Sequence, residues 1–475
     1  MAYVWFLLKI HLLAKVMMPK IVLNKQHVIL HGSWLILAIA AGCFYQTRLY
    51  TDAAYYLFHC INKANFHVEL NRYVLALSQV FPLLAVKLHL SLKAILIWAS
   101  VGHVLFHYLI FCVITYGLKQ PKVAIAVLLN QIIGLSSGYF TPQFELYYSV
   151  TLLVFIYAYL QQPFSRFIHY FYLVVVALLA LLGHPLANLL LLFMLGVDAL
   201  QNGTKKWKPY LLLLGLMIAT SIFKSYTATA YEIGKSQAFM DTLKQATYDV
   251  NYLNQLHVFL HTYYADLLLL LFASMGLLLY SKRFLHALFL LLGFVFVLAM
   301  ANISSYGFEH TRYQEQVYFP LVVLVTFVFA TQVLALQIKY KNILIGLILL
   351  TCIILRLSVF IPESKRFTAR IALMKTHIEV AQKHNLNKVI ITPEMGTLPN
   401  GIETNWSYSM ESLLLSSTAQ NTVSICTTED LDFAQNKNIN PNQFILRRWD
   451  IMPDTALNNK YFYLPTNSYT NLPME

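Results

Sequence analysis

Residues 284–302 read FLHALFLLLGFVFVLAMAN and contain no Asp, Glu, Lys or Arg. A helix of this length crosses most of the roughly 30 Å hydrocarbon core of a bilayer, because each residue adds about 1.5 Å. Lys282 and Arg283 precede the run, as cations commonly flank a spanning helix. Similar apolar runs recur along the chain. The sequence therefore predicts an α-helical polytopic membrane protein.

The composition of the 475 residues agrees with that prediction. Hydrophobic residues make up 58% of the chain and charged residues only 12%, whereas about a quarter of the residues in a soluble protein are charged. An ordinary soluble enzyme is therefore excluded. With 17 Gly, 15 Pro and 5 Cys, the chain is also neither collagenous nor a disulfide-stapled domain.

Apolar runs of spanning length predict about eleven transmembrane helices. They lie at 28–46, 93–117, 122–140, 147–161, 167–183, 186–200, 209–223, 257–280, 284–302, 317–337 and 342–361. The long segment between the runs 209–223 and 257–280 is expected to be a connection outside the membrane.

The charges predict which side each connection faces. Five alternate connections carry cations and no acid, and such loops face the cytoplasm in most membrane proteins. They contain Lys119 and Lys122; Arg166; Lys205, Lys206 and Lys208; Lys282 and Arg283; and Lys339 and Lys341. We therefore expect the N-terminus inside and the segment after the last span outside.

The net charge of +13 belongs to the membrane part of the chain. Residues 1–361 hold 24 Lys or Arg and 10 Asp or Glu, while residues 362–475 hold 10 and 11. Much of the excess sits in short loops, which is typical of topology-setting charge and not of a phosphate-binding stripe. No nucleic-acid partner is expected.

The first outer loop, 47–92, is long and partly apolar. Its segment 73–90 contains Gln79, Pro82 and Lys87, and a crossing there would invert the charge rule for the spans that follow. We predict two amphipathic helices lying in the membrane interface; a twelfth span is the alternative. Before the first span, residues 3–18 are expected to form an interfacial helix on the inner side.

The last 114 residues change character, so the chain divides into a membrane domain, 1–361, and a small outer α/β domain, 362–475. Helical and strand-like patterns alternate in this second part. The helices are predicted at 365–384 and 406–416, and the strands at 389–392, 422–426, 443–449 and 461–464.

Two carboxylates mark consecutive outer loops. Asp52 follows the first span in the aromatic stretch RLYTDAAYY, from Arg48 to Tyr56, and Glu145 lies in YFTPQFELYY, from Tyr139 to Tyr148. Apolar surroundings raise the pKa of a carboxyl group, which would suit a general base. Alternatively, Asp52 is a solvated loop charge and Glu145 favours the N-terminus of a helix.

The last outer loop, GFEHTRYQEQVYFP from Gly307 to Pro320, offers a cation with neighbours that could bind substrate. Arg312 and His310 lie just before a span. An Arg at this place either anchors the span at the interface or holds a phosphate group at headgroup level. Arg72, Lys63 and Arg356 are further cations on or near the same face.

Other polar residues suggest structure more than chemistry. His103 and His107 lie one turn apart inside a span and are expected to be packed and hydrogen-bonded. Asp266 lies within a span and should be paired or face a wet cavity, because an isolated charge in lipid is costly; Asp198 is a similar, inner candidate. His257 and His261 have metal-pair spacing but no further ligand nearby, so the metal content is unknown.

The short motifs of soluble enzymes do not occur in the chain. The sequence contains no P-loop, GxGxxG, GxSxG or HExxH pattern, and its cysteines have no CxxC spacing. An ATP-driven pump or a soluble-type hydrolase is therefore disfavoured. Cys60 and Cys426 both fall outside and could form a bridge.

This layout resembles the GT-C class of membrane glycosyltransferases, which includes protein O-mannosyltransferases and lipid A aminoarabinose transferases. The similar parts are the Asp after the first span (Asp52), two interfacial helices, the acid at a helix start in the second outer loop (Glu145), the late Arg-Tyr pair (Arg312 and Tyr313) and the outer C-terminal domain. Thr51 and Ala53 flank Asp52 where the class commonly has an acidic pair.

The resemblance implies transfer of a sugar from a polyprenyl-phosphate carrier to the hydroxyl of a lipid, glycan or protein acceptor. It also implies a bacterial inner membrane protein whose C-terminal domain lies outside. Asp52 would be the general base, and Arg312 and Arg72 would hold the phosphate, with Tyr313 and His310 as neighbours in substrate binding. Glu145 would orient the acceptor or a divalent cation; a divalent cation is the one cofactor that the resemblance leaves open.

Three other functions stay open. A polymerase or ligase of lipid-linked glycans would share the outward-facing site but would need a large loop between late spans. A transporter would need charged or broken helices at the membrane midplane in matching halves. A membrane scaffold without catalysis would make the outer carboxylates dispensable.

Overall fold

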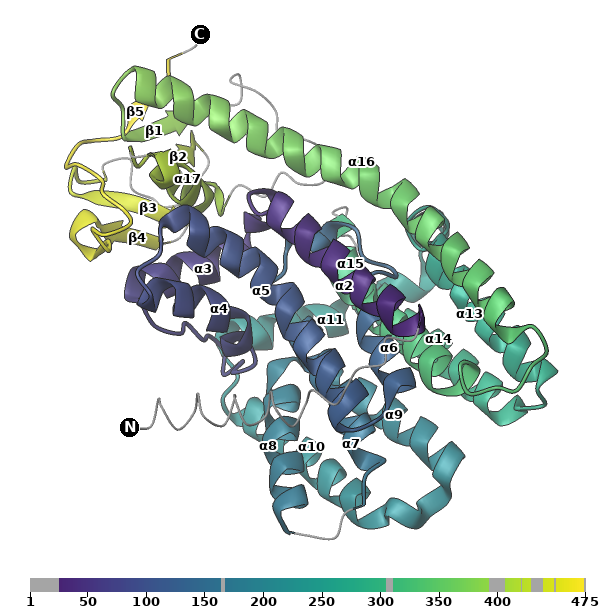
Figure 1. The fold of residues 1–475 in the computed structure, drawn as a ribbon. Helices are drawn as coiled ribbons and strands as arrows, with labels where there is room; N and C mark the ends of the chain where they lie inside the picture. The colour runs from purple at the N-terminus through teal and green to yellow at the C-terminus, as the bar shows by residue number, and fades with distance from the viewer. Residues whose placement is uncertain are drawn as a thin grey trace.

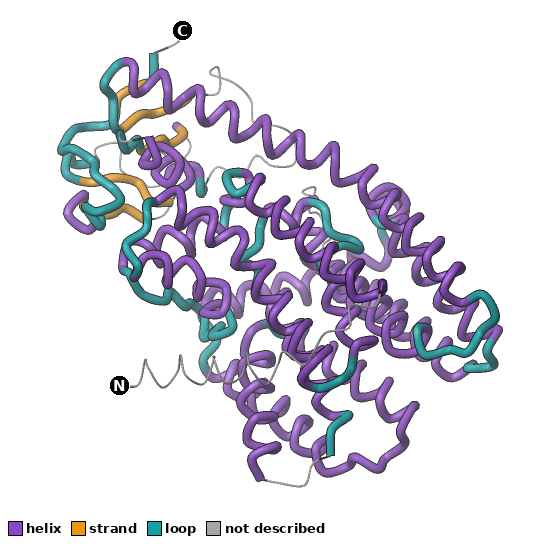
Figure 2. Tube along the Cα trace, in the orientation of Figure 1, coloured by secondary structure: helices purple, strands orange, loops and turns teal. Residues whose placement is uncertain are grey.

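The computed structural model describes residues 25–163, 167–304, 311–392, 406–419, 421–428, 439–447 and 450–473. The predicted interfacial helix at 3–18 lies outside these residues, and so does His310. Most of the described chain is helical, and short strands gather at one end of the molecule, which we call the strand-bearing end (Figures 1 and 2).

The helices and strands follow one another along the chain in a simple order, with every strand after the last long helix. The helices are α2 (Lys25–Cys43), α3 (Asp52–Lys63), α4 (Leu75–Lys87), α5 (Leu92–Cys112), α6 (Pro121–Leu129), α7 (Glu145–Leu160), α8 (Phe167–Gly183), α9 (Leu186–Asn202), α10 (Trp207–Tyr226), α11 (Ala230–Tyr248), α12 (Val250–Tyr263), α13 (Ala265–Tyr280), α14 (Phe284–Ser304), α15 (Thr311–Val328), α16 (Lys341–Lys383) and α17 (Tyr408–Ser416). The strands are β1 (Lys388–Ile391), β2 (Ser424–Thr427), β3 (Gln443–Arg447), β4 (Asp450–Pro453) and β5 (Thr470–Asn471).

The described chain has five helices that are long and apolar enough to cross a membrane, and six if α12 and α13 count as one bent span. The five are Leu92–Gly117, Trp207–Tyr226, Phe284–Ser304, Glu315–Val333 and Lys341–Lys383. Helix α14 exposes Leu285 and Leu292, and α16 exposes Ile354. Large apolar side chains exposed along such helices fit an α-helical membrane protein.

The predicted span 122–140 is not one helix. Helix α6 ends at Leu129, and the chain then turns irregularly until α7 begins at Glu145. Gly134 adopts a φ of +68°, and a Cβ atom there would lie 2.4 Å from the side chain of Val322. The run is apolar enough for a span, but α6 ends at Leu129, and Gly134, in a left-handed conformation, lies in the irregular segment that follows.

Two carboxylates bind the backbone that this break leaves without helical partners. Glu315 accepts hydrogen bonds from the amides of Ser136, Ser137 and Gly138 at 2.8 Å each, and from the Ser136 hydroxyl at 2.8 Å. Asp266 accepts from the amide of Gly134 at 3.1 Å. Irregular backbone is tolerated among membrane helices only where protein groups satisfy it in this way.

The predicted span 257–280 is also broken. Helices α12 and α13 meet at an angle of 85° beside Tyr264. Asp266 lies in the first turn of α13 and forms a buried ion pair with Arg356 of α16, whose Nε donates to it at 3.0 Å. The expectation that Asp266 is paired is confirmed. Arg356 is buried in this pair, so it is not the free outer cation that the sequence suggested.

The loop 47–92 contains two helices, α3 and α4, as predicted. Helix α4 has 13 residues, and at about 1.5 Å per residue it is too short to cross a bilayer alone. It packs closely on α5, where a Cβ atom at Gly102 would lie 2.5 Å from the side chain of Phe81. Helix α11 was not predicted; its start carries a capping box formed by Thr229 and Glu232.

Helix α16 runs without interruption through the predicted domain boundary at 361/362 and along one side of the bundle to the strand-bearing end (Figure 1). There β1 pairs in parallel with β2 and β5, while β3 and β4 form an antiparallel pair. Strands β1, β2 and β3 match predicted strands. Residues 461–464 form no strand, and β4 and β5 were not predicted.

We expect Glu315→Ala to lower the free energy of unfolding by about 3 kcal/mol or more, because it leaves several buried amides without acceptors. Thermal unfolding in detergent would measure the loss. Glu379→Ala, at an exposed position of α16, is the matched control. Equal melting temperatures for the two variants would contradict the role given to Glu315.

Candidate active site

Asp52 is the first residue of α3, and the backbone just before it is strained. Thr51 has a φ of +52° and a ψ of −113° and is fully buried. A β-branched residue rarely adopts a positive φ, and such outliers cluster at functional sites because surrounding contacts must hold them. Asp52 itself is partly exposed.

Glu411 of α17 holds this strained turn. The backbone amide of Thr51 donates to Glu411 at 3.2 Å, and the Ser407 hydroxyl donates to the same carboxylate at 2.6 Å. Arg370 of α16 forms a buried ion pair with Glu411 and lies 5.0 Å from the ring centre of Tyr50. The C-terminal part of the chain therefore fixes the backbone that positions Asp52.

Tyr56 lies within electrostatic range of both predicted carboxylates. It lies one helical turn after Asp52, on the same face of α3. Its hydroxyl interacts electrostatically with both Glu145 and Asp52; burial and these two acids raise the pKa of Tyr56 well above its usual value. Asp52 and Glu145 thus reach one neighbourhood from different parts of the chain.

Glu145 begins α7 and is buried, and its partner is Arg72 from the segment between α3 and α4. The two side chains form an ion pair in which the guanidinium donates to Oε1 of the carboxylate. The sequence predicted separate roles for these residues: Glu145 would orient the acceptor or a divalent cation, and Arg72 would hold the phosphate. The structure brings them into direct contact.

Sequence reasoning did not find the second cation of this cluster. Lys224, near the end of α10, interacts electrostatically with Arg72, Glu145 and Glu232. His184 lies between α8 and α9 with its ring 5.6 Å from that of Phe144. Desolvation and the cations Arg72 and Lys224 lower the pKa of His184, which keeps its imidazole neutral. Its position in the last turn of an apolar helix is the sequence feature that could have identified Lys224 as a candidate.

Arg312 and Tyr313 lie in the first turn of α15, but their side chains are outside the described residues, as is all of His310. One turn later, Glu315 binds the backbone of residues 136–138. The start of α15 therefore lies beside the segment that leads to Glu145, although the structure does not show where Arg312 points.

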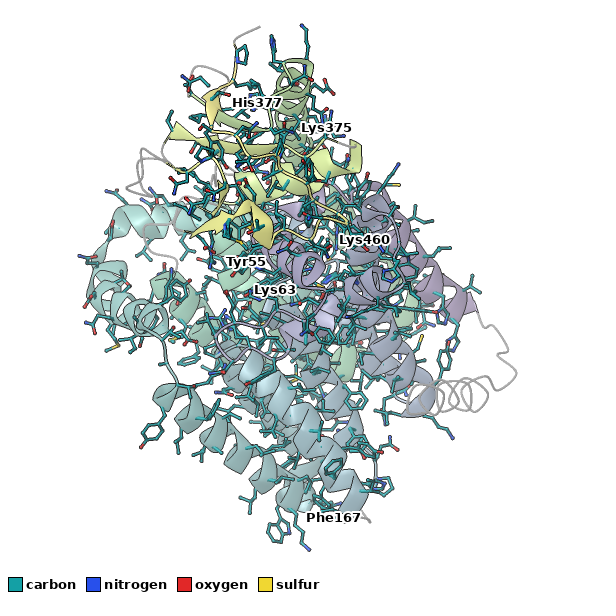
Figure 3. All side chains as sticks on the ribbon, turned by 90° about the vertical axis from the view of Figure 1, so that its left-hand side faces the viewer. Tyr55, Lys63, Phe167, Lys375, His377 and Lys460 are labelled. Atoms are coloured by element: carbon teal, nitrogen blue, oxygen red, sulfur yellow. The ribbon has the colours of Figure 1, made fainter. Side chains whose placement is uncertain are left out.

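A second polar network joins α3 to the strands. The Tyr55 hydroxyl donates to Glu69, and the His67 ring lies 3.2 Å from that hydroxyl and 3.3 Å from Glu69. The guanidinium of Arg447 in β3 lies 4.4 Å from the centre of the Tyr55 ring. Figure 3 shows Tyr55 next to the strands, with Phe167 at the opposite end of the molecule.

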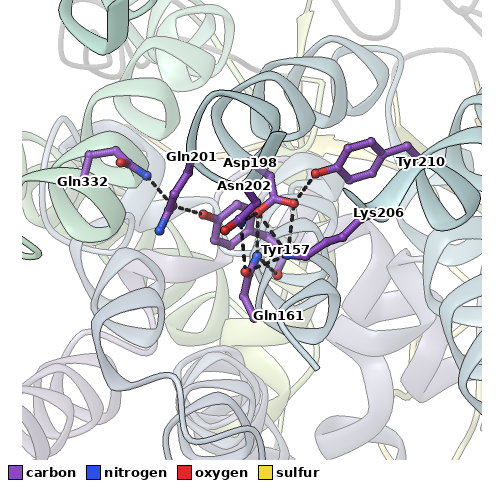
Figure 4. A network of polar contacts seen from close by, with 8 residues as sticks. All are labelled: Tyr157, Gln161, Asp198, Gln201, Asn202, Lys206, Tyr210 and Gln332. Carbon is purple, nitrogen blue, oxygen red and sulfur yellow. Dashed lines mark hydrogen bonds and ion pairs between the residues drawn. The ribbon is translucent and has the colours of Figure 1, made fainter. Parts of the chain in front are cut away.

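Asp198 belongs to a separate polar network (Figure 4). Its buried carboxylate accepts hydrogen bonds from Gln161 at 2.8 Å, Asn202 at 2.6 Å and Lys206 at 3.3 Å, and from the Tyr210 hydroxyl. These groups satisfy the charge and tie α7, α9 and α10 together, so Asp198 stabilises the helix packing.

The other polar candidates are structural within the described chain. His103 contacts the Tyr148 hydroxyl at 2.9 Å and Gln131 at 3.2 Å, so the expected packed histidine is confirmed. Cys60 and Cys426, both described by the structure, are not joined in a disulfide. No group of three His, Cys, Asp or Glu residues that could hold a metal occurs among the residues described.

No family model matches the chain, and no curated protein or solved structure matches it either. A functional assignment must therefore come from the site. It combines a partly exposed carboxylate, Asp52, with a buried tyrosine and two cations. Such a group can accept a proton at one point and hold an anion nearby.

The network around Glu69 predicts acid sensitivity. Its hydrogen bonds to His67 and Tyr55 lower the pKa of Glu69 from 4.5 to about 2. A lowered folded-state pKa stabilises the protein above pH 4.5, and that contribution is lost as pH falls toward 2. The melting temperature of the native protein should therefore exceed that of Glu69→Gln above pH 4.5, and the difference should vanish near pH 2. A difference independent of pH would contradict this.

Proposed function

We propose that this protein is a membrane glycosyltransferase that moves a sugar from a polyprenyl-phosphate carrier to an acceptor hydroxyl. The observation that carries the proposal is the common neighbourhood of Asp52 and Glu145 at Tyr56, with Arg72 and Lys224 beside them. The type of reaction, with its donor and acceptor, is taken from the resemblance of the sequence to the GT-C class.

The reaction requires one base and one anion-binding group. The acceptor oxygen attacks the anomeric carbon, the bond from that carbon to the phosphate oxygen breaks, and the carrier leaves as a phosphate anion. Asp52 takes the acceptor proton. Because the leaving group is already stabilised as an anion, no general acid is needed, unlike in a glycosidase with its two carboxylates.

The cations of the site would bind the phosphate group of the donor. Arg72 is fixed by Glu145 and about one-fifth exposed, so it can keep this partner while its other nitrogens bind phosphate oxygens. Lys224 adds positive charge to the same cluster. Arg312, with Tyr313 and His310 as its neighbours in substrate binding, would also hold the phosphate. Glu145 then acts through Arg72 and orients the acceptor; a divalent cation is an optional addition.

This proposal includes the topology that the charges predict. Apart from 122–140, which is not one helix, and 257–280, which is the bent pair α12 and α13, the predicted spans coincide with apolar helices, either the long helices or the shorter ones α2, α7, α8 and α9. With the N-terminus in the cytoplasm, the strand-bearing end and Asp52 lie outside a bacterial inner membrane. The acceptor is then a lipid, glycan or protein in that compartment.

A transporter is the alternative that one observation favours. The chain breaks after α6 and again between α12 and α13, and discontinuous helices often form transport sites. Here, however, the amides freed after α6 are already bound by Asp266 and Glu315. We therefore favour the transferase. No particular observation favours a glycan polymerase, a ligase or a scaffold.

Asp52→Asn should lower sugar transfer at least about 100-fold, because the amide cannot take the acceptor proton. The assay follows release of the free carrier phosphate from a panel of polyprenyl-phosphate sugars by the purified protein. Asp241→Asn, on exposed α11, is the matched control and should keep full activity. Full activity of Asp52→Asn, in protein that melts normally, would remove Asp52 from the mechanism.

Arg72→Gln should raise the KM for the lipid donor roughly tenfold or more, since hydrogen bonds to charged groups contribute about 1.5–3 kcal/mol. Lys63→Gln, at an exposed position of α3, is the matched control and should leave the KM unchanged. The double variant Arg72→Gln with Glu145→Gln tells whether Arg72 binds phosphate or only neutralises the charge of Glu145. If Arg72 only neutralises Glu145, the double variant recovers the native KM, and the proposed phosphate contact is wrong.

A further inference from the structure

Arg48 is a buried cation that the proposed reaction does not use. It lies in a short 3₁₀ turn, Thr47–Leu49, that joins α2 to the turn before Asp52, and its side chain is only 2% exposed. The centre of its guanidinium lies 4.2 Å from the ring centre of Tyr139. Two of its three nitrogens, Nε and Nη2, have no hydrogen-bond partner among the described residues.

Within the described part of the chain, no carboxylate pairs with Arg48 or is among the groups that act most strongly on its charge. The groups that act on it electrostatically are Tyr139, Tyr147 and Tyr148, and its own charge acts on His103 and His107. The other buried arginines differ, because Arg356 pairs with Asp266 and Arg370 with Glu411. A buried charge without a counter-charge costs free energy, and each unsatisfied buried group calls for a physical reason.

Arg48 lines a cavity whose walls come from several elements. The lining includes Trp34 and Leu37 of α2, His103 of α5, and Gln131, Gly138 and Tyr139 from the segment after α6. Both ring nitrogens of His103 already have partners, in Tyr148 and Gln131. The indole Nε1 of Trp34 is buried and has no partner in the part of the chain that the structure describes. The lining, which also contains the apolar Val104 and Leu135, thus includes unsatisfied donors of Trp34 and Arg48.

This combination selects an anionic oxygen. A guanidinium matches the geometry of phosphate oxygens and binds them more strongly than it binds neutral acceptors. An indole N–H can only donate. The cavity has room for roughly one oxygen-sized group and is not fully enclosed, so it suits a single oxygen of a larger group that extends out of it.

We propose that Arg48 and Trp34 form a binding site for a phosphate oxygen, separate from the cluster of Arg72, Glu145 and Lys224. The phosphate is either free or attached to a lipid chain, and both present the same anionic oxygen. The site does not depend on glycosyl transfer, so it stands even if Asp52 proves dispensable.

The proposal can be tested by comparing the melting temperatures of variants at Arg48, which has no ion-pair partner among the described residues, and at Arg370, which pairs with Glu411. Without phosphate, Arg48→Met should melt no lower than the native protein, because it removes an uncompensated buried charge. Inorganic phosphate or farnesyl phosphate should raise the native melting temperature by about 2 °C or more at saturation and leave Arg48→Met unchanged. Arg370→Met is the matched control. It should have a lower melting temperature than the native protein in every condition, because it leaves the buried carboxylate of Glu411 without its counter-charge.

Trp34 provides a second readout that does not depend on unfolding. The fluorescence difference between the native protein and Trp34→Phe should change with phosphate and saturate, and Arg48→Met should abolish that change. A response to both phosphates supports the site with a free ion as ligand, and a response to farnesyl phosphate but not to farnesol or inorganic phosphate supports a lipid headgroup.

Three outcomes would overturn the proposal. The first is a lower melting temperature for Arg48→Met together with no effect of either phosphate on the native protein, which would make Arg48 purely structural. The second is an equal response to farnesol, which would indicate an apolar site. The third is a response to chloride alone, which would indicate a small-anion site without phosphate recognition.

Discussion

The carboxylate of Glu315 binds the backbone amides of residues 136–138, and the position of Glu145 follows from that contact. An apolar bundle cannot contain irregular chain unless protein groups satisfy its polar backbone. Glu315 meets this requirement from α15, and Asp266 does so for Gly134 from α13. The break after α6 can therefore lie inside the bundle, and α7 begins where Glu145 reaches Arg72 and Tyr56.

A second buried acid, Glu411, fixes the backbone next to Asp52 in a similar way. Glu411 is held by Arg370 and Ser407 and accepts the amide of Thr51, the residue with a positive φ. The C-terminal part of the chain is thus not a separate appendage, because it fixes the turn that begins α3. Both halves of the candidate site depend on carboxylates that take no part in the proposed chemistry.

Much of the helical layout could be predicted from the sequence, because spanning helices are recognisable from apolar length alone. The two helices of the first loop were also predicted, as were three strands. The errors concern backbone geometry. The runs 122–140 and 257–280 are apolar enough for spans, but Gly134 and the bend at Tyr264 break them. Hydropathy does not report a positive φ or an 85° bend.

Local composition was enough to predict an α-helical membrane protein, its long apolar helices and the two acids of consecutive loops. The partners of the buried charges were visible only in the folded molecule: Glu145 pairs with Arg72 and Asp266 with Arg356, whereas no carboxylate among the described residues pairs with Arg48. The physical reason is that the effect of a charge in an apolar bundle depends on what lies within a few ångströms, and those neighbours come from distant parts of the chain.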